Sequence, residues 1–166
     1  MRLRPFIPAL DLDIVVSWIA DQRTHALWSG NRIPFPAEGE SFLRFFGELA
    51  VNCGDTPFTA IDDSGRQAGF FSFSLNTDTG EGMLKFVVVD PALRGQGVGR
   101  KMLALAVRYG FEIAGADAVQ LMVFSANVRA IRCYEAAGFA LRHTEYGAFR
   151  FGDELWDRCN MVIRRE

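Results

Sequence analysis

The sequence has few of the residues that build disulfide frameworks and metal centres. It contains three cysteines, Cys53, Cys133 and Cys159, and two histidines among 166 residues. The odd number and wide spacing of the cysteines exclude a disulfide-stapled fold and give no zinc-type ligand pattern. The chain also lacks a secretion signal and an apolar run near 18 residues. We therefore expect a cytoplasmic protein with reduced thiols, no metal and no membrane span.

An excess of positive charge is also missing. The formal net charge is −2 and the sequence pI is about 5.7, which argues against a broad nucleic-acid surface. We find no internal repeat, low-complexity segment or change of composition that would mark a linker. With 49% hydrophobic residues and 15 phenylalanines, the chain can build a substantial core. We expect a single domain covering residues 1–166.

Hydrophobic spacing predicts a mixed α/β (α+β) order of elements. We expect a first strand over Arg2–Phe6 and then a helix capped by Asp11. An aromatic loop over His25–Pro36 and a helix over Phe42–Leu49 follow. The remaining elements are three antiparallel strands, a helix, a strand, a second helix and a closing hairpin: Pro57–Asp62, Gln67–Leu75, Glu81–Val89, Gly97–Ala114, Ala118–Phe124, Val128–Ala137, Phe139–Tyr146 and Arg158–Ile163, with a polar loop at Gly147–Asp157.

One strand–helix–strand unit dominates this order. A connection of that length, from Glu81–Val89 through the helix to Ala118–Phe124, implies a parallel pair with a right-handed crossover. The sheet should therefore be mostly antiparallel, with a single parallel pair and helices on both faces.

The stretch from Lys85 to Lys101 carries the clearest chemical signal. An apolar β-branched run ends at Asp90-Pro91, and three glycines at alternate positions then lead into a helix. The first N–H groups of a helix have no partner within the helix, and its dipole favours negative charge there. Glycines let a phosphate approach the backbone, and Arg94, Arg100 and Lys101 add positive charge. The stretch predicts a pocket for a phosphorylated cofactor.

The spacing of the glycines narrows the choice of cofactor. A dinucleotide fingerprint from Gly95 would need its third glycine at Arg100, and no Gly-Lys-Ser/Thr closes a Walker loop. A dinucleotide-binding oxidoreductase is thereby excluded. The pattern Arg94-x-x-Gly97-x-Gly99 instead resembles the coenzyme A pyrophosphate loop of the GNAT N-acetyltransferase superfamily.

A second segment carries the same resemblance. Asn127, Ala130, Tyr134, Gly138 and Phe139 match the family signature Asn-x-x-Ala-x-x-x-Tyr-x-x-x-Gly-Phe. The expected element order is also that of GNAT domains, so the resemblance covers most of the chain. It is strongest from Glu81 to Phe139 and weakest before Pro57. The tail from Gly152 to Met161 is loosely similar to the subgroup that acetylates ribosomal-protein N-termini and small amines.

The resemblance implies acetyl-CoA as cofactor and direct attack of an amine on the thioester. Tyr134 would be the general acid toward the CoA sulfur, because its phenol is protonated at pH 7. Asn127 would reach the pantetheine or cap its helix, or do both. The implied cofactor-binding residues lie on the central strand, the glycine turn and the second helix: Val87, Val88, Val89, Arg94, Gly95, Gln96, Gly97, Val98, Gly99, Arg100, Asn127, Ala130 and Tyr134.

The general base is the least defined part of the predicted site. Some members of the family place a glutamate on the strand before the second motif, but here Leu121–Phe124 is wholly apolar. Glu81, the carboxylate on the central strand, is our candidate base, acting directly or through water, and a solvated strand end is the alternative. His25 and His143 are further candidates. A Cys133–His143 nucleophile is disfavoured, because Cys133 points about 100° away from Tyr134 on the helix.

The acceptor side is predicted from aromatic residues. Trp28 and Phe35 in the first loop would contact the acceptor amine, with the loop between Tyr146 and Trp156 nearby. The partner would be a small-molecule or peptide amine, and the resemblance is compatible with a homodimer. We therefore expect an N-acetyltransferase acting on a primary amine. The alternative is a CoA-binding sensor or interaction domain of the same fold without transferase activity.

Overall fold

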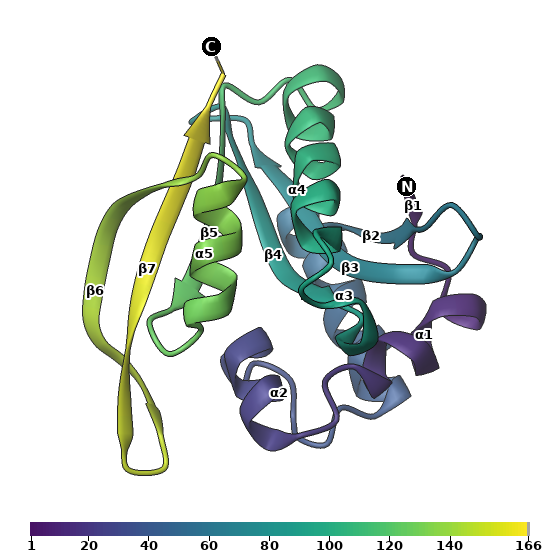
Figure 1. Ribbon diagram of the computed structural model, residues 1–166, viewed down its shortest axis with the longest axis vertical. Helices are drawn as coiled ribbons and strands as arrows, with labels where there is room; N and C mark the ends of the chain where they lie inside the picture. The colour runs from purple at the N-terminus through teal and green to yellow at the C-terminus, as the bar shows by residue number, and fades with distance from the viewer. Residues whose placement is uncertain (166) are drawn as a thin grey trace.

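The computed structural model describes residues 1–165 and arranges them around a twisted seven-stranded sheet (Figure 1). The strands follow the spatial order β1-β2-β3-β4-β5-β7-β6. Their bounds are Arg2–Pro5 (β1), Thr56–Ile61 (β2), Gln67–Asn76 (β3), Glu81–Val89 (β4), Ala118–Phe124 (β5), Ala140–Phe151 (β6) and Glu154–Arg164 (β7). Every neighbouring pair is antiparallel except β4 and β5, which are parallel. The predicted architecture is confirmed.

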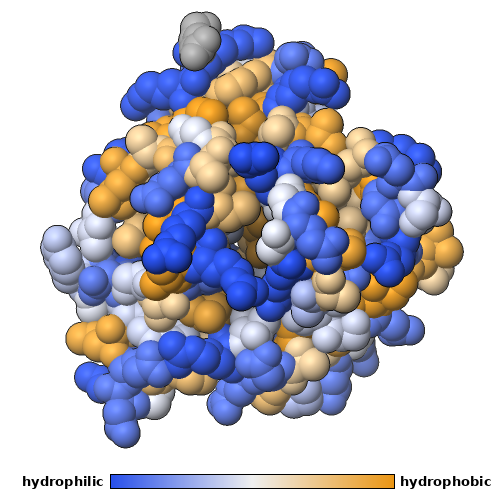
Figure 2. Space-filling view, in the orientation of Figure 1, coloured by the Kyte–Doolittle hydropathy of each residue, from blue (hydrophilic) through white to orange (hydrophobic). Residues whose placement is uncertain are grey.

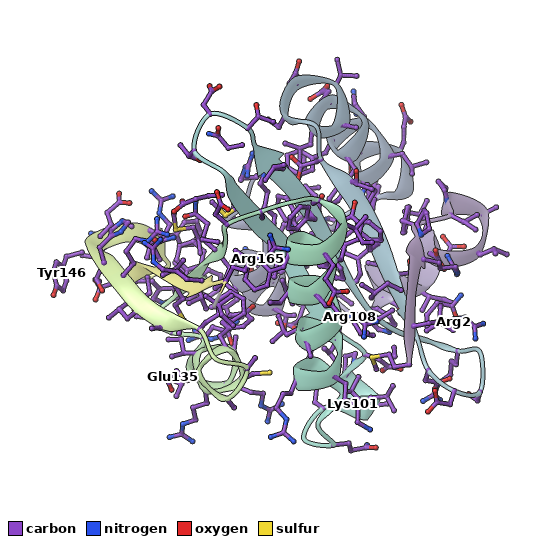
Figure 3. The ribbon with its side chains drawn as sticks, turned by 90° about the horizontal axis from the view of Figure 1, so that it is seen from above. Arg2, Lys101, Arg108, Glu135, Tyr146 and Arg165 are labelled. Carbon is purple, nitrogen blue, oxygen red and sulfur yellow. The ribbon has the colours of Figure 1, made fainter. Side chains whose placement is uncertain are left out.

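Helices cover both faces of this sheet. They are Pro8–Ser17 (α1), Gln22–Ser29 (α2), Gly39–Cys53 (α3), Val98–Arg108 (α4) and Val128–Ala136 (α5). Figures 1 and 3 both show α4 and α5 side by side on one face. The first three helices pack on the other face. The outer strands β1 and β6 end the sheet, and Figure 3 places Arg2 and Tyr146 on opposite sides of the molecule. Within the described residues, no helix is both long and apolar enough to cross a membrane.

Each face has its own apolar core. Met102, Leu103 and Tyr134 from α4 and α5 pack with Leu84 and Leu121 of the central strands. On the other face, a second cluster joins α1, α2 and α3 to β3 and β4. Its buried rings include Phe42, Phe46, Phe70 and Phe86, with neighbouring ring centroids 4.6–5.8 Å apart. These phenylalanines fix the first three helices on the sheet.

Three local predictions were wrong. The helix α1 begins at Pro8, whose fixed φ suits a first helical position, so Asp11 lies inside the helix instead of capping it. The predicted loop starting at His25 is helical as far as Ser29. Asp21 caps α2 by accepting a hydrogen bond from the Thr24 amide at 2.8 Å.

The third error concerns the closing hairpin. Its polar sequence suggested a long loop over Gly147–Asp157, but β6 and β7 continue through most of that range. Phe149 and Trp156 are cross-strand partners, and their rings stack with centroids 5.4 Å apart. This aromatic packing stabilises the two strands, although the polar residues in the same stretch of sequence are typical of a loop.

The helix predicted for Gly97–Ala114 changes form near its end. After α4, residues Tyr109–Ile113 form a π-helical turn. A Cβ at Gly110 would lie 2.7 Å from a methyl group of Val119, so the glycine permits close contact between this turn and β5.

Asp11 is a buried ionic anchor for the N-terminal segment. Its carboxylate accepts two hydrogen bonds from Arg4, at 2.6 and 2.7 Å, and one each from the Ile7 amide, Thr59 and Gln67. Burial acts to raise the pKa of Asp11, but these hydrogen bonds outweigh it and lower the pKa to about 2. The ionised carboxylate thus connects β1, α1, β2 and β3.

We predict that Asp11→Ala lowers the free energy of unfolding by about 3–5 kcal/mol, because it leaves Arg4 without its partner. In wild type, the folded-state pKa lies below the unfolded value. The contribution of ionised Asp11 to the free energy of unfolding is therefore complete above pH 4. As the pH falls toward 2, about 2 kcal/mol of this contribution is lost. Urea unfolding at several pH values measures both effects. Asp13→Ala, on the exposed side of α1, is the control, and equal effects of the two variants would contradict the anchor.

Candidate active site

The central feature of the site is the divergence of β4 and β5. Their parallel pairing covers Glu81↔Ala118 to Leu84↔Leu121, while β4 continues to Val89 and β5 to Phe124. Beyond Leu84 and Leu121 the two strands border a cavity of about 470 Å³. Figure 2 shows this face of the molecule hollowed near its middle, with hydrophilic residues around the opening. Among the described residues, no strand pairs with this edge of β4 beyond Leu84, which leaves it open to an extended ligand. The Val89 carbonyl already accepts a long hydrogen bond from Arg94 Nε, at 3.4 Å.

A bulge in β4 marks the point of divergence. The β3–β4 register shifts between Phe70 and Ser72, and Phe86 opposite has a φ of +53°. A bulky residue in this conformation is strained by about 1–2 kcal/mol. The Trp28 indole Nε1 donates a hydrogen bond of 2.8 Å to the Phe86 carbonyl, which holds the bulge and fixes α2 against it.

The glycine turn forms one end of the cavity. Gly95 and Gly97 have φ values of +78° and +77°, which favour glycine, and Gly97 is the N-cap of α4. No side chain caps this helix, so its first N–H groups remain available to an anion. Gly99 serves packing instead, because a Cβ there would lie 3.1 Å from Cys133 Sγ.

Three arginines add positive charge to the cavity: Arg94, Arg100 and Arg129. Burial lowers the pKa of the Arg94 guanidinium, and the nearby charge of Arg129 lowers it further. Asp21 and Asp90 act in the opposite direction, but neither carboxylate is among the residues that line the cavity, which favours an anionic ligand.

The helix α5 brings the second motif to the same cavity. Asn127 caps the helix by accepting a hydrogen bond of 3.3 Å from the Ala130 amide. Ala130 and Tyr134, four residues apart, both line the cavity. Burial raises the pKa of the Tyr134 phenol far above its usual value, so the hydroxyl stays protonated.

Most predicted cofactor residues meet at this cavity. Its lining includes Val87, Val88, Val89, Arg94, Gly95, Gly97, Gly99, Arg100, Asn127, Ala130 and Tyr134. Gln96 and Val98 are outside it, and the Gln96 amide donates instead to the Ala92 carbonyl at 3.0 Å. Trp28, which the sequence predicts to contact the acceptor, is part of the lining.

The structure places Glu81, the predicted base, away from the cavity. Glu81 begins β4, before the divergence, and does not line the cavity. Its carboxylate accepts hydrogen bonds from Arg142 at 2.8 and 3.1 Å and from Gln120 at 2.6 Å. The Arg142 hydrogen bonds lower the pKa of Glu81, which makes it a weaker base. The sequence did not reveal the Glu81–Arg142 ion pair, because the two residues are 61 positions apart in the chain.

The other candidates for base and acceptor contact are also outside the cavity lining. His25 is fully buried behind Trp28 and Phe35, and neither ring nitrogen has a hydrogen-bond partner among the described residues. His143 is on the outer strand β6. Phe35 packs its ring on His25, with centroids 5.4 Å apart, and contributes nothing to the lining. The structure thus does not bring Phe35 to the cavity with Trp28.

Sequence reasoning missed several lining residues. Thr24 and Leu27 come from the same turn of α2 as Trp28, Met122 lies on β5, and Arg129 lies within the second motif. Recognising Asp21 as an N-cap and Gly30 as a helix end would have predicted α2 and its cavity-facing residues.

Comparison with known proteins supports one family. The sequence profile described as the acetyltransferase (GNAT) family matches residues 20–139. A mycothiol acetyltransferase of Propionibacterium freudenreichii is 34% identical over 90 residues, which are 53% of this chain and 28% of that protein. A mycothiol acetyltransferase of Beutenbergia cavernae is 30% identical over 131 residues, 74% of this chain and 44% of the other.

A solved structure extends the comparison to the fold. The spermidine N-acetyltransferase of Vibrio cholerae, in complex with CoA and spermine, superposes with a TM-score of 0.83. It is 19% identical and is matched over 98% of this chain and 94% of its own. The chain spans less than half the length of the curated relatives described above. The profile covers both sequence motifs and the cavity that they form, and the chain belongs to the acetyltransferase (GNAT) family.

Proposed function

We propose that this protein is an acetyl-CoA-dependent N-acetyltransferase that acetylates a primary amine. The observation that carries the proposal is the cavity between β4 and β5, which joins the glycine turn to Tyr134. Its features fit coenzyme A. The uncapped start of α4 and three arginines suit the phosphates, and the free edge at Val87–Val89 suits the amides of the pantetheine.

Acetyl-CoA would supply an activated acetyl group as a thioester. The protein's own contribution is to hold that group, exclude water and move protons. Val87–Val89 would hold the pantetheine amides, and the α4 N-terminus would hold the phosphates. The hydroxyl of Tyr134, kept protonated by burial, would protonate the departing sulfur. The α2 wall, with Thr24, Leu27 and Trp28, shields the acceptor side.

Further parts of the proposal concern the context in which the chain works. We propose that residues 1–166 act as one domain and that the protein is cytoplasmic, in agreement with three free cysteines. A homodimer is supported by the outer strand β6, where Leu141 and Tyr146 are 60% and 83% exposed. The acceptor is a small molecule or a peptide N-terminus.

CoA release from acetyl-CoA, measured across a panel of amines and peptides, tests the proposal. Acetyl-CoA binding without CoA release on any amine would instead support a sensor domain.

We predict that Gly97→Val weakens acetyl-CoA binding by at least about 10-fold. A β-branched residue at a φ of +77° costs about 1–2 kcal/mol and shifts the N–H groups that begin α4. Titration calorimetry measures the affinity. Gly65→Val is the matched control, because Gly65 has a φ of +87° and an equally open Cβ position but lies in the β2–β3 turn. Equal affinities of the two variants would refute the role of the turn.

We predict that Tyr134→Phe lowers kcat by about 100-fold or more while the affinity for acetyl-CoA stays within a few-fold, since only the proton donor is removed. Steady-state kinetics and direct binding measurements separate the two effects. Tyr146→Phe removes the same hydroxyl from an exposed tyrosine and should leave both values unchanged. An unchanged kcat in Tyr134→Phe would remove its assignment as the acid.

A further inference from the structure

The ionisable groups that line the cavity are all poor proton acceptors at neutral pH. They are Arg94, Arg100, Arg129, Cys133 and Tyr134. Arginine does not give up its proton at any physiological pH. Burial raises the pKa of the Cys133 thiol and of the Tyr134 phenol, so both stay protonated near pH 7. At neutral pH, therefore, these five groups are poor acceptors of a proton from an ammonium ion.

Three carboxylates around the cavity are already paired with cations, whereas Asp21, the cap of α2, accepts from the Thr24 amide and lies close enough to act on Arg94. Each of the three paired carboxylates contacts a residue that is adjacent in sequence to a lining residue. Each also forms an ion pair with a cation or accepts hydrogen bonds. Asp55 pairs with Lys85 at 2.7 Å and also accepts from Ser72, Glu81 pairs with Arg142, and Glu154 pairs with Arg23 and accepts from Trp156. An incoming ammonium would have to displace one of these cations to gain a counter-charge from any of the three paired carboxylates.

The wall on the acceptor side is mostly apolar. It consists of Leu27, Trp28, Phe86 and Met122, with Thr24 as its polar member. Such a wall disfavours a charged ammonium, because burial removes water and supplies no compensating charge. The cavity therefore favours the uncharged form of an amine.

On the basis of the proposed acetyl transfer, we propose that the acceptor is a weakly basic primary amine with an apolar side group, bound in its uncharged form. The α-amino group of an amino-acid amide or peptide has this chemistry, with a pKa of about 7.7–8.0 against about 10.4 for a lysine-type amine. At pH 7.5 about one third of the former is uncharged, and about one thousandth of the latter.

The proton balance of the reaction agrees with this choice. The nitrogen lone pair forms a bond to the acetyl carbon, and the carbon–sulfur bond breaks. Sulfur receives the Tyr134 hydroxyl proton, and the tyrosine recovers a proton from the nitrogen. An uncharged amine and a thioester thus give an amide and a thiol without net release of a proton. A charged ammonium would first have to lose a proton, for which the lining offers no ready acceptor at neutral pH.

Two substrates with the same phenyl side group test the proposal. Phenylalaninamide carries a weakly basic amine and phenethylamine a strongly basic one. We expect kcat/KM at pH 7.5 to be about 300-fold higher for phenylalaninamide, which is the ratio of the two uncharged fractions. Each pH profile should rise as its own amine loses its proton, and the two values should agree within a few-fold per uncharged amine. Equal values at pH 7.5, or one profile common to both amines, would overturn the proposal, as would a preference for spermidine.

A binding measurement supplies a readout apart from turnover. Phenethylamine is titrated into the protein with CoA present, at pH 7.5, in two buffers that differ in heat of ionisation. We expect the release of about one proton for each amine bound; binding without proton release would overturn the proposal. Leu27→Glu adds a carboxylate to the wall and should abolish proton release and improve turnover of spermidine, whereas Leu27→Gln should do neither.

These outcomes separate the acceptor from the reaction. If acetyl-CoA binds and no amine is acetylated, the proposed function itself fails. If amines are acetylated and spermidine or phenethylamine is preferred at pH 7.5, the function stands and the acceptor class is wrong.

Discussion

The separation of β4 from β5 is the constraint on which the site depends. Parallel pairing ends at Leu84 and Leu121, and both strands continue with different partners on either side of a cavity. The gap opens one edge of β4 to a ligand and lets α4 and α5 present their N-terminal ends to it. Without the divergence, β4 and β5 would pair along their whole length, and no cavity would lie between the two sequence motifs.

A strained residue and a helix keep the strands apart. Phe86 adopts a left-handed backbone conformation within β4, and its carbonyl receives the indole N–H of Trp28. The same helix supplies Thr24 and Leu27 to the acceptor wall and is linked to the β6–β7 hairpin by the Arg23–Glu154 pair. The Arg23 guanidinium also lies over the Trp156 ring, 5.1 Å from its centroid. The acceptor wall thus depends on contacts from both ends of the chain.

The sequence was most informative where local chemistry determines structure. The glycine turn, the Asn127 cap and the β-branched run of β4 need little from distant residues, and each was predicted correctly. Prediction failed where a distant partner decides the outcome. Glu81 looked like a candidate base until Arg142 was seen beside it, and Trp156 stabilises strands that read as a loop. Asp11 looked like a cap, although its partners lie on three strands as well as at the start of its own helix.

The central claim is that the cavity between β4 and β5 is built for coenzyme A. Thermal unfolding with saturating acetyl-CoA or with the same concentration of NAD tests it most directly. We predict that acetyl-CoA raises Tm by about 5–10 °C, because it binds only the folded protein, and that NAD has no effect. A rise with NAD and none with acetyl-CoA would contradict the account.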